Sequence, residues 1–206
     1  TRTQPFVRRT PLLRSDWLSH RTGREVFLKL ESLQVTGSFK ARGAVNAVRA
    51  LVERLAPDGE PPRIVTASAG NHGRALAWAA RSAGVRVVVF TPRRAPAAKV
   101  EAIRENGAEL RAEAGSYEEA ERLAKAFALE TGAVFLSAYS HSDLIAATGS
   151  IALEVLEDLA DTACIVVPVG GGGLVAGIAA AAKLAKPGVE VVGVEAEASR
   201  PFAASL

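Results

Sequence analysis

The chain has 206 residues, of which 49% are hydrophobic and 23% are charged, and its formal net charge is +3 at pH 7. These values are typical of a globular protein with one large domain or two small ones, and they exclude a disordered chain. The small basic excess forms no block of like charges, which argues against nucleic acid as a partner.

A single cysteine, Cys164, lies within an apolar run. One cysteine permits no disulfide within the chain, and the composition predicts a reducing compartment, the cytoplasm. Every apolar stretch is interrupted by glycine, lysine or aspartate before it reaches about 18 residues, so the sequence predicts no membrane span. Residues 1–14 lack the apolar segment of a signal peptide.

Short runs rich in β-branched residues alternate with longer, alanine-rich segments along the chain. The predicted strands are 25–30, 63–67, 85–91, 133–136, 163–169 and 189–195. The predicted helices are 39–55, 71–82, 96–106, 117–130, 149–159 and 174–184. This alternation predicts an α/β fold with mainly parallel sheets flanked by helices.

Two points along the chain indicate a division into lobes. Residues 57–62, PDGEPP, break both helix and strand and form the best candidate for a linker. A second change in composition comes at the short polar stretch 138–143. We therefore expect a large lobe formed by residues 1–58 and 142–206, and a small lobe formed by residues 59–141.

Residues 36–43, TGSFKARG, form the first of three loops that can carry chemistry. Ser38 is predicted to cap the helix that follows, which places Lys40 and Arg42 in the first helical turn. A cation there costs about 0.3–1 kcal/mol against the helix dipole, unless the lysine is neutralised, for example as an imine, or an anion binds nearby. The alternative is that both side chains are solvated on a surface helix.

Residues 68–73, SAGNHG, form the second loop and directly follow a predicted strand. Small residues let backbone N–H groups converge on an anion, and Asn71 can donate a hydrogen bond to a ligand oxygen. The alternative is an ordinary turn that leads into a helix. His20, His72 and His141 are too dispersed along the chain to predict a metal site.

The third loop consists of four consecutive glycines, Gly170, Gly171, Gly172 and Gly173, between a predicted strand and an alanine-rich helix. Each glycine costs up to about 1 kcal/mol relative to alanine inside a regular element, so four in a row indicate a function. A strand, a glycine loop and a helix N-terminus together make a phosphate-binding site. The alternative is a merely flexible turn.

A dinucleotide is one candidate for the phosphate ligand. Gly171, Gly173 and Ala176 match the GxGxxG/A fingerprint, and Glu195 ends the next predicted strand about 20 residues later. Taken alone, residues 163–195 predict the nicotinamide-binding βαβ unit of an oxidoreductase. This interpretation leaves the loops around Lys40 and Asn71 unexplained.

Together the three loops resemble those of the pyridoxal-phosphate enzymes of fold type II, the tryptophan synthase β-like family, and within it the threonine/serine dehydratase group. The resemblance covers nearly the whole chain and is carried by RRTPLLRS at 8–15, KLESLQVTGSFKARGA at 29–44, SAGNHGRALA at 68–77 and PVGGGGLVAGIA at 168–179. The string KARG at 40–43 resembles dehydratases and serine racemases more than cysteine or threonine synthases. The resemblance implies two lobes, a homodimer and a chain that continues beyond residue 206.

The resemblance also implies the residues of a cofactor site. Lys40 would hold pyridoxal 5'-phosphate covalently, Asn71 would donate to the 3-oxygen of its ring, and the glycine loop would bind its phosphate. The implied cofactor-binding set is Phe39, Lys40, Asn71, Gly170, Gly171, Gly172, Gly173 and Leu174. The substrate carboxylate would be bound by backbone N–H groups and the Ser68 hydroxyl, in the implied set Ser68, Ala69, Gly70, Asn71 and His72. A lysine that acts as a base needs a pKa depressed by desolvation or by nearby positive charge, and we expect Arg42 and the helix N-terminus to provide that charge.

The implied reaction is the dehydration and deamination of L-threonine or L-serine to a 2-oxo acid and ammonia, with Lys40 as the catalytic base. The alternatives are a serine racemase or another enzyme of the same family. In the resembling racemases a serine stands where this chain has Ala69, so we expect elimination. Residues 145–150, IAATGS, depart from the usual IAGQGT. Some members of the resembling group bind a divalent cation near the strand that corresponds to the one ending at Glu195. Residues 199–201, SRP, add no second carboxylate there, so we expect no metal site.

Overall fold

The computed structural model describes residues 2–56, 59–200 and 202–205. Its largest sheet has four parallel strands in the order β5-β4-β3-β6. The strands are β3 (Ile64–Ala67), β4 (Val87–Pro92), β5 (Glu109–Ala114) and β6 (Val134–Phe135). Ile64 of the inner strand β3 is in register with Val87 on one side and with Val134 on the other.

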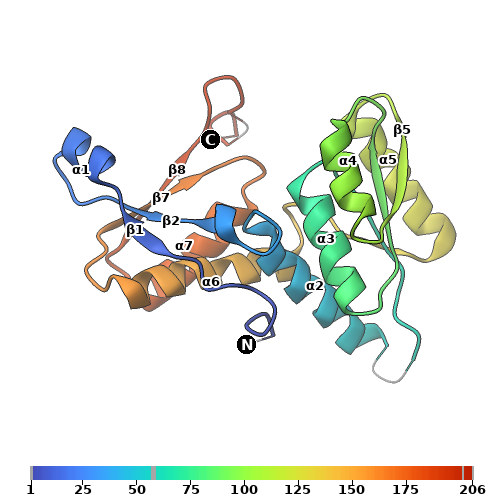
Figure 1. The fold of residues 1–206 in the computed structure, drawn as a ribbon, viewed down its shortest axis with the longest axis horizontal. Helices are drawn as coiled ribbons and strands as arrows, with labels where there is room; N and C mark the ends of the chain where they lie inside the picture. The colour runs from blue at the N-terminus through green and yellow to red at the C-terminus, as the bar shows by residue number, and fades with distance from the viewer. Residues whose placement is uncertain (1, 57–58, 201, 206) are drawn as a thin grey trace.

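Helices cover both faces of this sheet, as Figure 1 shows in green and yellow. One face packs against α2 (Lys40–Leu55), α3 (Asn71–Ser82) and α4 (Ala97–Arg104), and the other face packs against α5 (Tyr117–Thr131). Val89 points to the first face and Val88 to the second, because successive residues of a strand alternate. Burial on both faces explains the continuous valine run of β4.

The rest of the chain contains two small sheets and a helix pair. The antiparallel strands β1 (Leu12–Arg14) and β2 (Phe27–Lys29) are joined through α1 (Asp16–Thr22), and the short helix η1 (Glu31–Leu33) follows β2. The parallel strands β7 (Cys164–Pro168) and β8 (Glu190–Val194) form the second small sheet. The helices α6 (Ser142–Asp158) and α7 (Gly173–Ala185) lie side by side next to it.

The predicted α/β class with mainly parallel sheets is confirmed, but several elements differ from their predicted bounds. The helix expected at 149–159 begins at Ser142, because the His141 side chain accepts a hydrogen bond from the Asp143 N–H and caps it. Strand β5 escaped prediction because it is an edge strand with the charged sequence ELRAEA. Strand β1 and helix α1 also escaped prediction.

The lobe boundaries at residues 59 and 141 stay a prediction. Of the expected linker, residues 57–58 lie outside the described residues, as does residue 206 at the end of the chain. None of the helices in the described part of the chain is long and apolar enough to cross a membrane.

The contact between α6 and α7 depends on glycines that let the two helices approach closely. A Cβ on Gly177 would lie 2.1 Å from the Thr148 Oγ1 and 2.2 Å from the Ile145 carbonyl oxygen. A backbone oxygen cannot turn away as a side chain can, so the helices would have to separate. We expect Gly177→Ala to lower the free energy of unfolding by about 1–3 kcal/mol, measured by urea denaturation. Gly188→Ala is the control, because a Cβ there meets nothing within 4 Å.

Candidate active site

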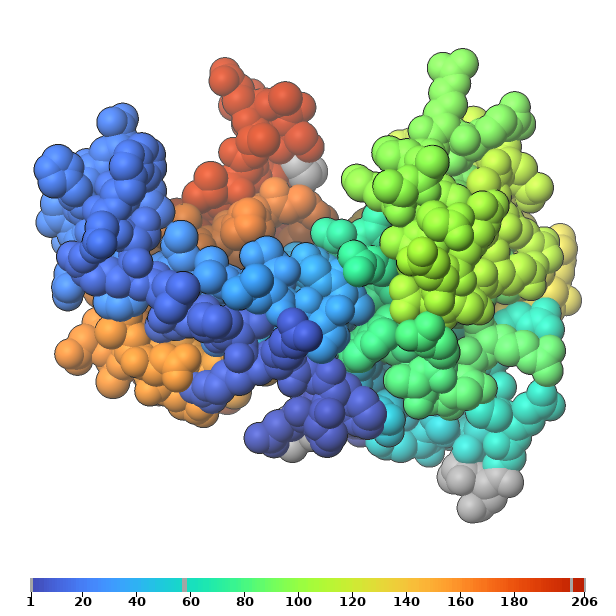
Figure 2. Space-filling model, in the orientation of Figure 1, coloured from blue at the N-terminus to red at the C-terminus, as the bar shows by residue number. Residues whose placement is uncertain are grey.

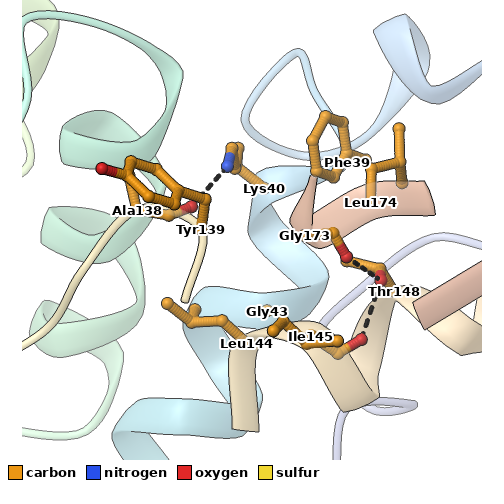
Figure 3. A pocket seen from close by; sticks show the side chains of 10 residues that line it. All are labelled: Phe39, Lys40, Gly43, Ala138, Tyr139, Leu144, Ile145, Thr148, Gly173 and Leu174. Carbon is orange, nitrogen blue, oxygen red and sulfur yellow. Dashed lines mark hydrogen bonds between the residues drawn. The ribbon is translucent and has the colours of Figure 1, made fainter. Parts of the chain in front are cut away.

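Lys40 is the first residue of α2 and points into a cavity between α2, α6 and α7 (Figure 3). Its Nζ donates a hydrogen bond of 2.6 Å to the Ala138 carbonyl oxygen, and it lies 5.0 Å from the centre of the Phe39 ring. Burial disfavours the charged form and lowers the pKa of Lys40 below its usual value. The chain therefore places a partly desolvated amine at a helix N-terminus.

The predicted capping role of Ser38 is wrong. The residue at the N-cap of α2 is Phe39, which has helical dihedral angles and makes no capping hydrogen bond through its side chain. The Ser38 hydroxyl is buried and, among the described residues, has no hydrogen-bond partner. The Ser38 backbone instead tightens the entry to the helix, since its carbonyl oxygen accepts from the Ala41 N–H at 3.4 Å. The prediction that Lys40 and Arg42 occupy the first turn is correct.

Arg42 is not solvated, and its charge does not lower the pKa of Lys40; both expectations are wrong. Only 1% of its side chain is exposed. The guanidinium binds both carboxylate oxygens of Glu31, at 2.8 and 3.0 Å, and both of Glu154, at 2.5 and 2.9 Å. Burial lowers the pKa of Arg42, but the hydrogen bonds to these carboxylates outweigh burial and raise it. The two carboxylates neutralise the cation, so desolvation alone lowers the pKa of Lys40.

The cavity at Lys40 has about 280 Å³ of empty space, part of it open to solvent. Its lining is mostly apolar and consists of Phe39, Lys40, Gly43, Ala138, Tyr139, Leu144, Ile145, Thr148, Gly173 and Leu174. Thr148 was not predicted as a site residue; its hydroxyl lies 2.7 Å from the Ile145 carbonyl oxygen and 3.2 Å from that of Gly173. It thereby joins α6 to the glycine loop, as the dashed lines in Figure 3 show. The only signal in the sequence was the unusual segment IAATGS that contains it.

The glycine loop turns into α7 through Gly172, which has a φ of +81° and makes no side-chain cap. Such a left-handed conformation favours glycine strongly. Two aromatic rings lie close to the loop: a Cβ on Gly171 would approach Tyr139 to 2.5 Å, and one on Gly172 would approach Phe202 to 2.3 Å. A Cβ on Gly170 meets no atom of the described residues within 4 Å. The first N–H groups of α7 have no helical acceptor, so they fit a phosphate.

The second loop follows the carboxyl end of β3 and connects this strand to α3. The Ser68 hydroxyl is buried and accepts hydrogen bonds from the N–H groups of Gly70, at 3.2 Å, and Gly73, at 3.0 Å. Ala69 and Gly70 are partly exposed, and Asn71 is exposed as the first residue of α3. The Asn71 amide makes no hydrogen bond with the described residues, so it is available to a ligand. The Ser68 hydroxyl thus stabilises the turn through these two hydrogen bonds.

His72 follows directly and is 3% exposed. Neither of its ring nitrogens makes a well-aligned hydrogen bond with the described residues, and the Leu136 backbone only partly offsets the lowering of its pKa. Burial, and next the positive charge of Lys40, lower the pKa of His72 to about 3. The imidazole is therefore neutral at pH 7, and its side chain adds no positive charge for a substrate carboxylate.

The dinucleotide interpretation is only partly compatible with this geometry. Strand β7, helix α7 and strand β8 do form a parallel βαβ unit. However, the two carboxylate oxygens of Glu195 accept hydrogen bonds of 2.9 Å from the backbone N–H groups of Phe202 and Ala203. The carboxylate that would bind a ribose is already engaged. Within the described residues, no group of three or more histidine, cysteine, aspartate or glutamate side chains could hold a metal ion.

Three features of the site fit pyridoxal phosphate: a desolvated lysine amine, a mostly apolar cavity beside it, and a glycine loop at a helix N-terminus. Residues 3–206 match the family model described as pyridoxal-phosphate dependent enzyme. The chain belongs to this family. It is 43% identical over 200 residues to the L-threonine ammonia-lyase of Thermotoga maritima. The aligned residues make up 97% of this chain and 49% of that protein. The chain thus spans about half the length of the curated relatives it matches.

Two solved structures superimpose closely on the chain. Maize serine racemase gives a TM-score of 0.91 with 36% identity, covering 99% of this chain and 61% of the racemase chain. Threonine deaminase isoform 2 from Solanum lycopersicum gives a TM-score of 0.87 with 30% identity, covering 94% and 52% of the two chains. The family match favours pyridoxal phosphate over a nicotinamide dinucleotide as the ligand of the glycine loop.

Proposed function

We propose that the protein is a pyridoxal-phosphate-dependent ammonia-lyase that converts L-threonine or L-serine to a 2-oxo acid and ammonia. The observation that carries this proposal is the Lys40 amine, which has a lowered pKa and faces a cavity whose lining includes Gly173, the last residue of the glycine loop. The 43% identity to a relative named L-threonine ammonia-lyase supports the substrate class.

In this proposal the cofactor lies between three segments of the chain. Lys40 holds it covalently, Phe39 and Leu174 contact it from the apolar lining, and the glycine loop binds its phosphate through backbone N–H groups. The exposed Asn71 amide donates to the 3-oxygen of the ring. Both parts of the chain are needed, since Asn71 lies beside the four-stranded sheet and the glycine loop beside β7 and β8.

Pyridoxal phosphate supplies an electron-withdrawing ring conjugated with the substrate nitrogen, which makes the hydrogen on the substrate Cα acidic. The substrate amine would take the place of Lys40 on the cofactor, and the freed Nζ would then remove that proton. The lowered pKa of Lys40 enlarges the neutral fraction that can act as a base at pH 7. In the loop formed by Ser68, Ala69, Gly70, Asn71 and His72, the backbone N–H groups of Ala69, Asn71 and His72 would bind the substrate carboxylate. Those of Ser68 and Gly70 already donate to the Phe90 carbonyl oxygen and to the Ser68 hydroxyl. The β-hydroxyl would take a proton from the Lys40 Nζ and leave as water, and hydrolysis would release the 2-oxo acid and ammonia.

The absorption spectrum of the purified protein tests the cofactor assignment. Bound pyridoxal phosphate joined to a lysine absorbs in the visible range, so we expect a yellow protein whose band disappears on treatment with borohydride. Mass spectrometry should then locate the reduced adduct on the peptide that carries Lys40. A colourless protein that binds a nicotinamide cofactor instead would contradict the proposal.

The proposal also predicts elimination with little racemisation. Racemisation needs an acid/base group on each face of the substrate Cα, and Lys40 provides one of them. Ala69 lies at the position from which a serine hydroxyl would provide the other, and a methyl group neither gives nor takes a proton. We expect L-serine to yield pyruvate and ammonia with D-serine below about one hundredth of the product, measured by chiral chromatography.

Ala69→Ser is the matched variant for this test. A hydroxyl at this partly exposed position supplies the missing acid/base group, so we expect the share of D-serine to rise at least about tenfold. Substantial D-serine formation by the unmodified protein would favour a racemase, the function named for the structurally similar maize enzyme.

Small amino acids are the only partners that this reaction requires, and we infer a homodimer in the cytoplasm as its setting. The reducing compartment is supported by the single Cys164, which is exposed and unpaired. The dimer is supported by the family resemblance and is tested by sedimentation equilibrium. A monomer across the micromolar range would contradict it.

A further inference from the structure

A set of buried charges lies on the opposite side of α2 from the proposed cofactor. It contains Arg42 on α2, Glu31 on η1, Glu154 on α6 and Lys29 on β2. The Lys29 Nζ lies 2.7 Å from Glu154, so that carboxylate is shared between two cations. The exposed fractions of the four side chains are 1% for Arg42, 14% for Glu31, 14% for Glu154 and 9% for Lys29. We refer to these four side chains as the buried charge set.

The buried charge set joins three separate segments at the first turn of α2. Glu31 is 11 residues before Arg42 and Glu154 is 112 residues after it. Arg42 also donates to the Ser150 hydroxyl at 3.0 Å, which adds a second contact with α6. The planar guanidinium satisfies these acceptors in a fixed geometry that a lysine ammonium cannot reproduce.

Lys40 and Arg42 are two residues apart and therefore point to opposite sides of the helix. One side chain reaches the cavity, while the other is held by carboxylates from η1 and α6. Any tilt or rotation of the first turn would move both. The contacts of Arg42 thus fix the direction in which the Lys40 amine points.

We propose that Arg42 is a positioning residue for Lys40, which it holds in place through a buried set of charges that sum to zero. The four members are two cations and two carboxylates. Hydrogen bonds from Arg42 and Lys29 outweigh burial and lower the pKa of Glu154, so the carboxylate stays ionised at neutral pH. The inference rests on the proposed function only for the chemical role of Lys40.

A balanced set supports the first turn without placing a net charge beside the amine. Beside Lys29 of the buried charge set lies Asp158, which is paired with Arg9. Arg9 also pairs with Glu157, and all three side chains are more exposed than the set. On the cavity side, His72 is neutral at pH 7, and Tyr139 is the remaining titratable residue in the described lining. Removing one member of the buried charge set should therefore shift the pKa of Lys40.

Removing a cation from the buried charge set and removing an anion from it should shift the pKa of Lys40 in opposite directions. A purely structural role cannot produce this difference. Arg42→Met leaves a negative charge in excess, which favours the ammonium form and raises the pKa of Lys40. Glu31→Gln leaves a positive charge in excess, which lowers the pKa of Lys40. A buried charge about 10 Å away at an effective dielectric constant of about 20 shifts a pKa by about one unit. Because the double variant restores the balance, its pKa should return toward that of the unmodified protein.

The experiment measures the acetylation rate of Lys40 by acetic anhydride between pH 6 and 11 in the full protein freed of bound cofactor. Mass spectrometry of the peptide that carries Lys40 gives its pKa without any catalytic turnover. The exposed Lys99 serves as the internal reference. Arg54→Gln is the matched control, because Arg54 also joins α2 to α6, through Asp143, but is half exposed.

We expect shifts of opposite sign for the two single variants, a return in the double variant and no shift for Arg54→Gln. Shifts of the same sign, or none, would overturn the proposal. If Arg42→Met does not fold, Glu154→Gln removes the carboxylate shared by Lys29 and Arg42 and should act like Glu31→Gln. Arg42→Lys keeps the charge balance but not the bidentate contacts, so it should shift the pKa of Lys40 less than Arg42→Met does. Shifts of the expected signs in a protein that shows no yellow band would refute the proposed function and leave this inference intact.

Discussion

Replacing Lys40 by alanine is expected to reduce the rate of 2-oxo acid formation about a thousandfold or more. The substitution removes both the covalent attachment and the base, and either loss alone is severe. The partly buried amine makes one hydrogen bond, to the Ala138 carbonyl oxygen, so its loss should leave the thermal midpoint of unfolding within a few degrees. The glycine loop remains, and pyridoxal phosphate should still bind without a covalent bond.

The assay follows the 2-oxo acid product from L-threonine and L-serine, with Lys99→Ala as the control. Lys99 is exposed on α4 and away from the cavity lining, so its loss should leave the rate unchanged. A Lys40→Ala protein with the elimination rate of the unmodified enzyme would show that another group is the base.

Replacing Gly171 or Gly172 by valine is expected to weaken the binding of pyridoxal phosphate by at least about tenfold. Gly172 has a φ of +81°, which costs a residue with a side chain about 1–2 kcal/mol. At Gly171 a side chain would meet the Tyr139 ring at 2.5 Å, and this ring also lines the cavity. Both substitutions therefore displace the backbone N–H groups that we propose bind the phosphate.

Equilibrium dialysis measures this affinity directly, and Gly170→Ala provides the control. A Cβ at Gly170 meets nothing within 4 Å, and its φ is not positive, so this variant should bind almost normally. Unchanged affinity in both valine variants would place the phosphate elsewhere. Circular dichroism should show an unchanged overall content of helix and strand. The helices α4 and α5 lie on the opposite side of the molecule from β7 and β8, as Figures 1 and 2 show.

Local patterns predicted most of the elements that carry the site. The strands β3 and β4 are apolar runs because both faces of their parallel sheet are covered, and such runs are visible without a structure. Strand β7 is a similar run, although most of its residues are exposed. The glycine loop was equally visible, since Gly172 needs a left-handed backbone. Strand β5 was not, because an edge strand tolerates the charged residues of ELRAEA.

Contacts between distant residues were the part that sequence patterns did not predict. Ser38 was expected to cap α2, but its hydroxyl is buried without a partner in the described chain, and Phe39 takes the capping position. Arg42 was expected to act as a nearby cation, and two carboxylates neutralise it. No local rule connects Arg42 to Glu154, which lies 112 residues further along the chain.

The sequence by itself determined the α/β class, the place of Lys40 in a first helical turn, and the glycine loop at a helix N-terminus. Each of these follows from the conformational preferences of a few neighbouring residues. Only the tertiary structure decided the electrostatic state of the site, because burial and ion pairing depend on segments that meet only when the chain folds. Desolvation, not the charge of Arg42, lowers the pKa of Lys40. Packing of α6 against α7 brings Thr148 to the glycine loop, which no spacing in the sequence indicates.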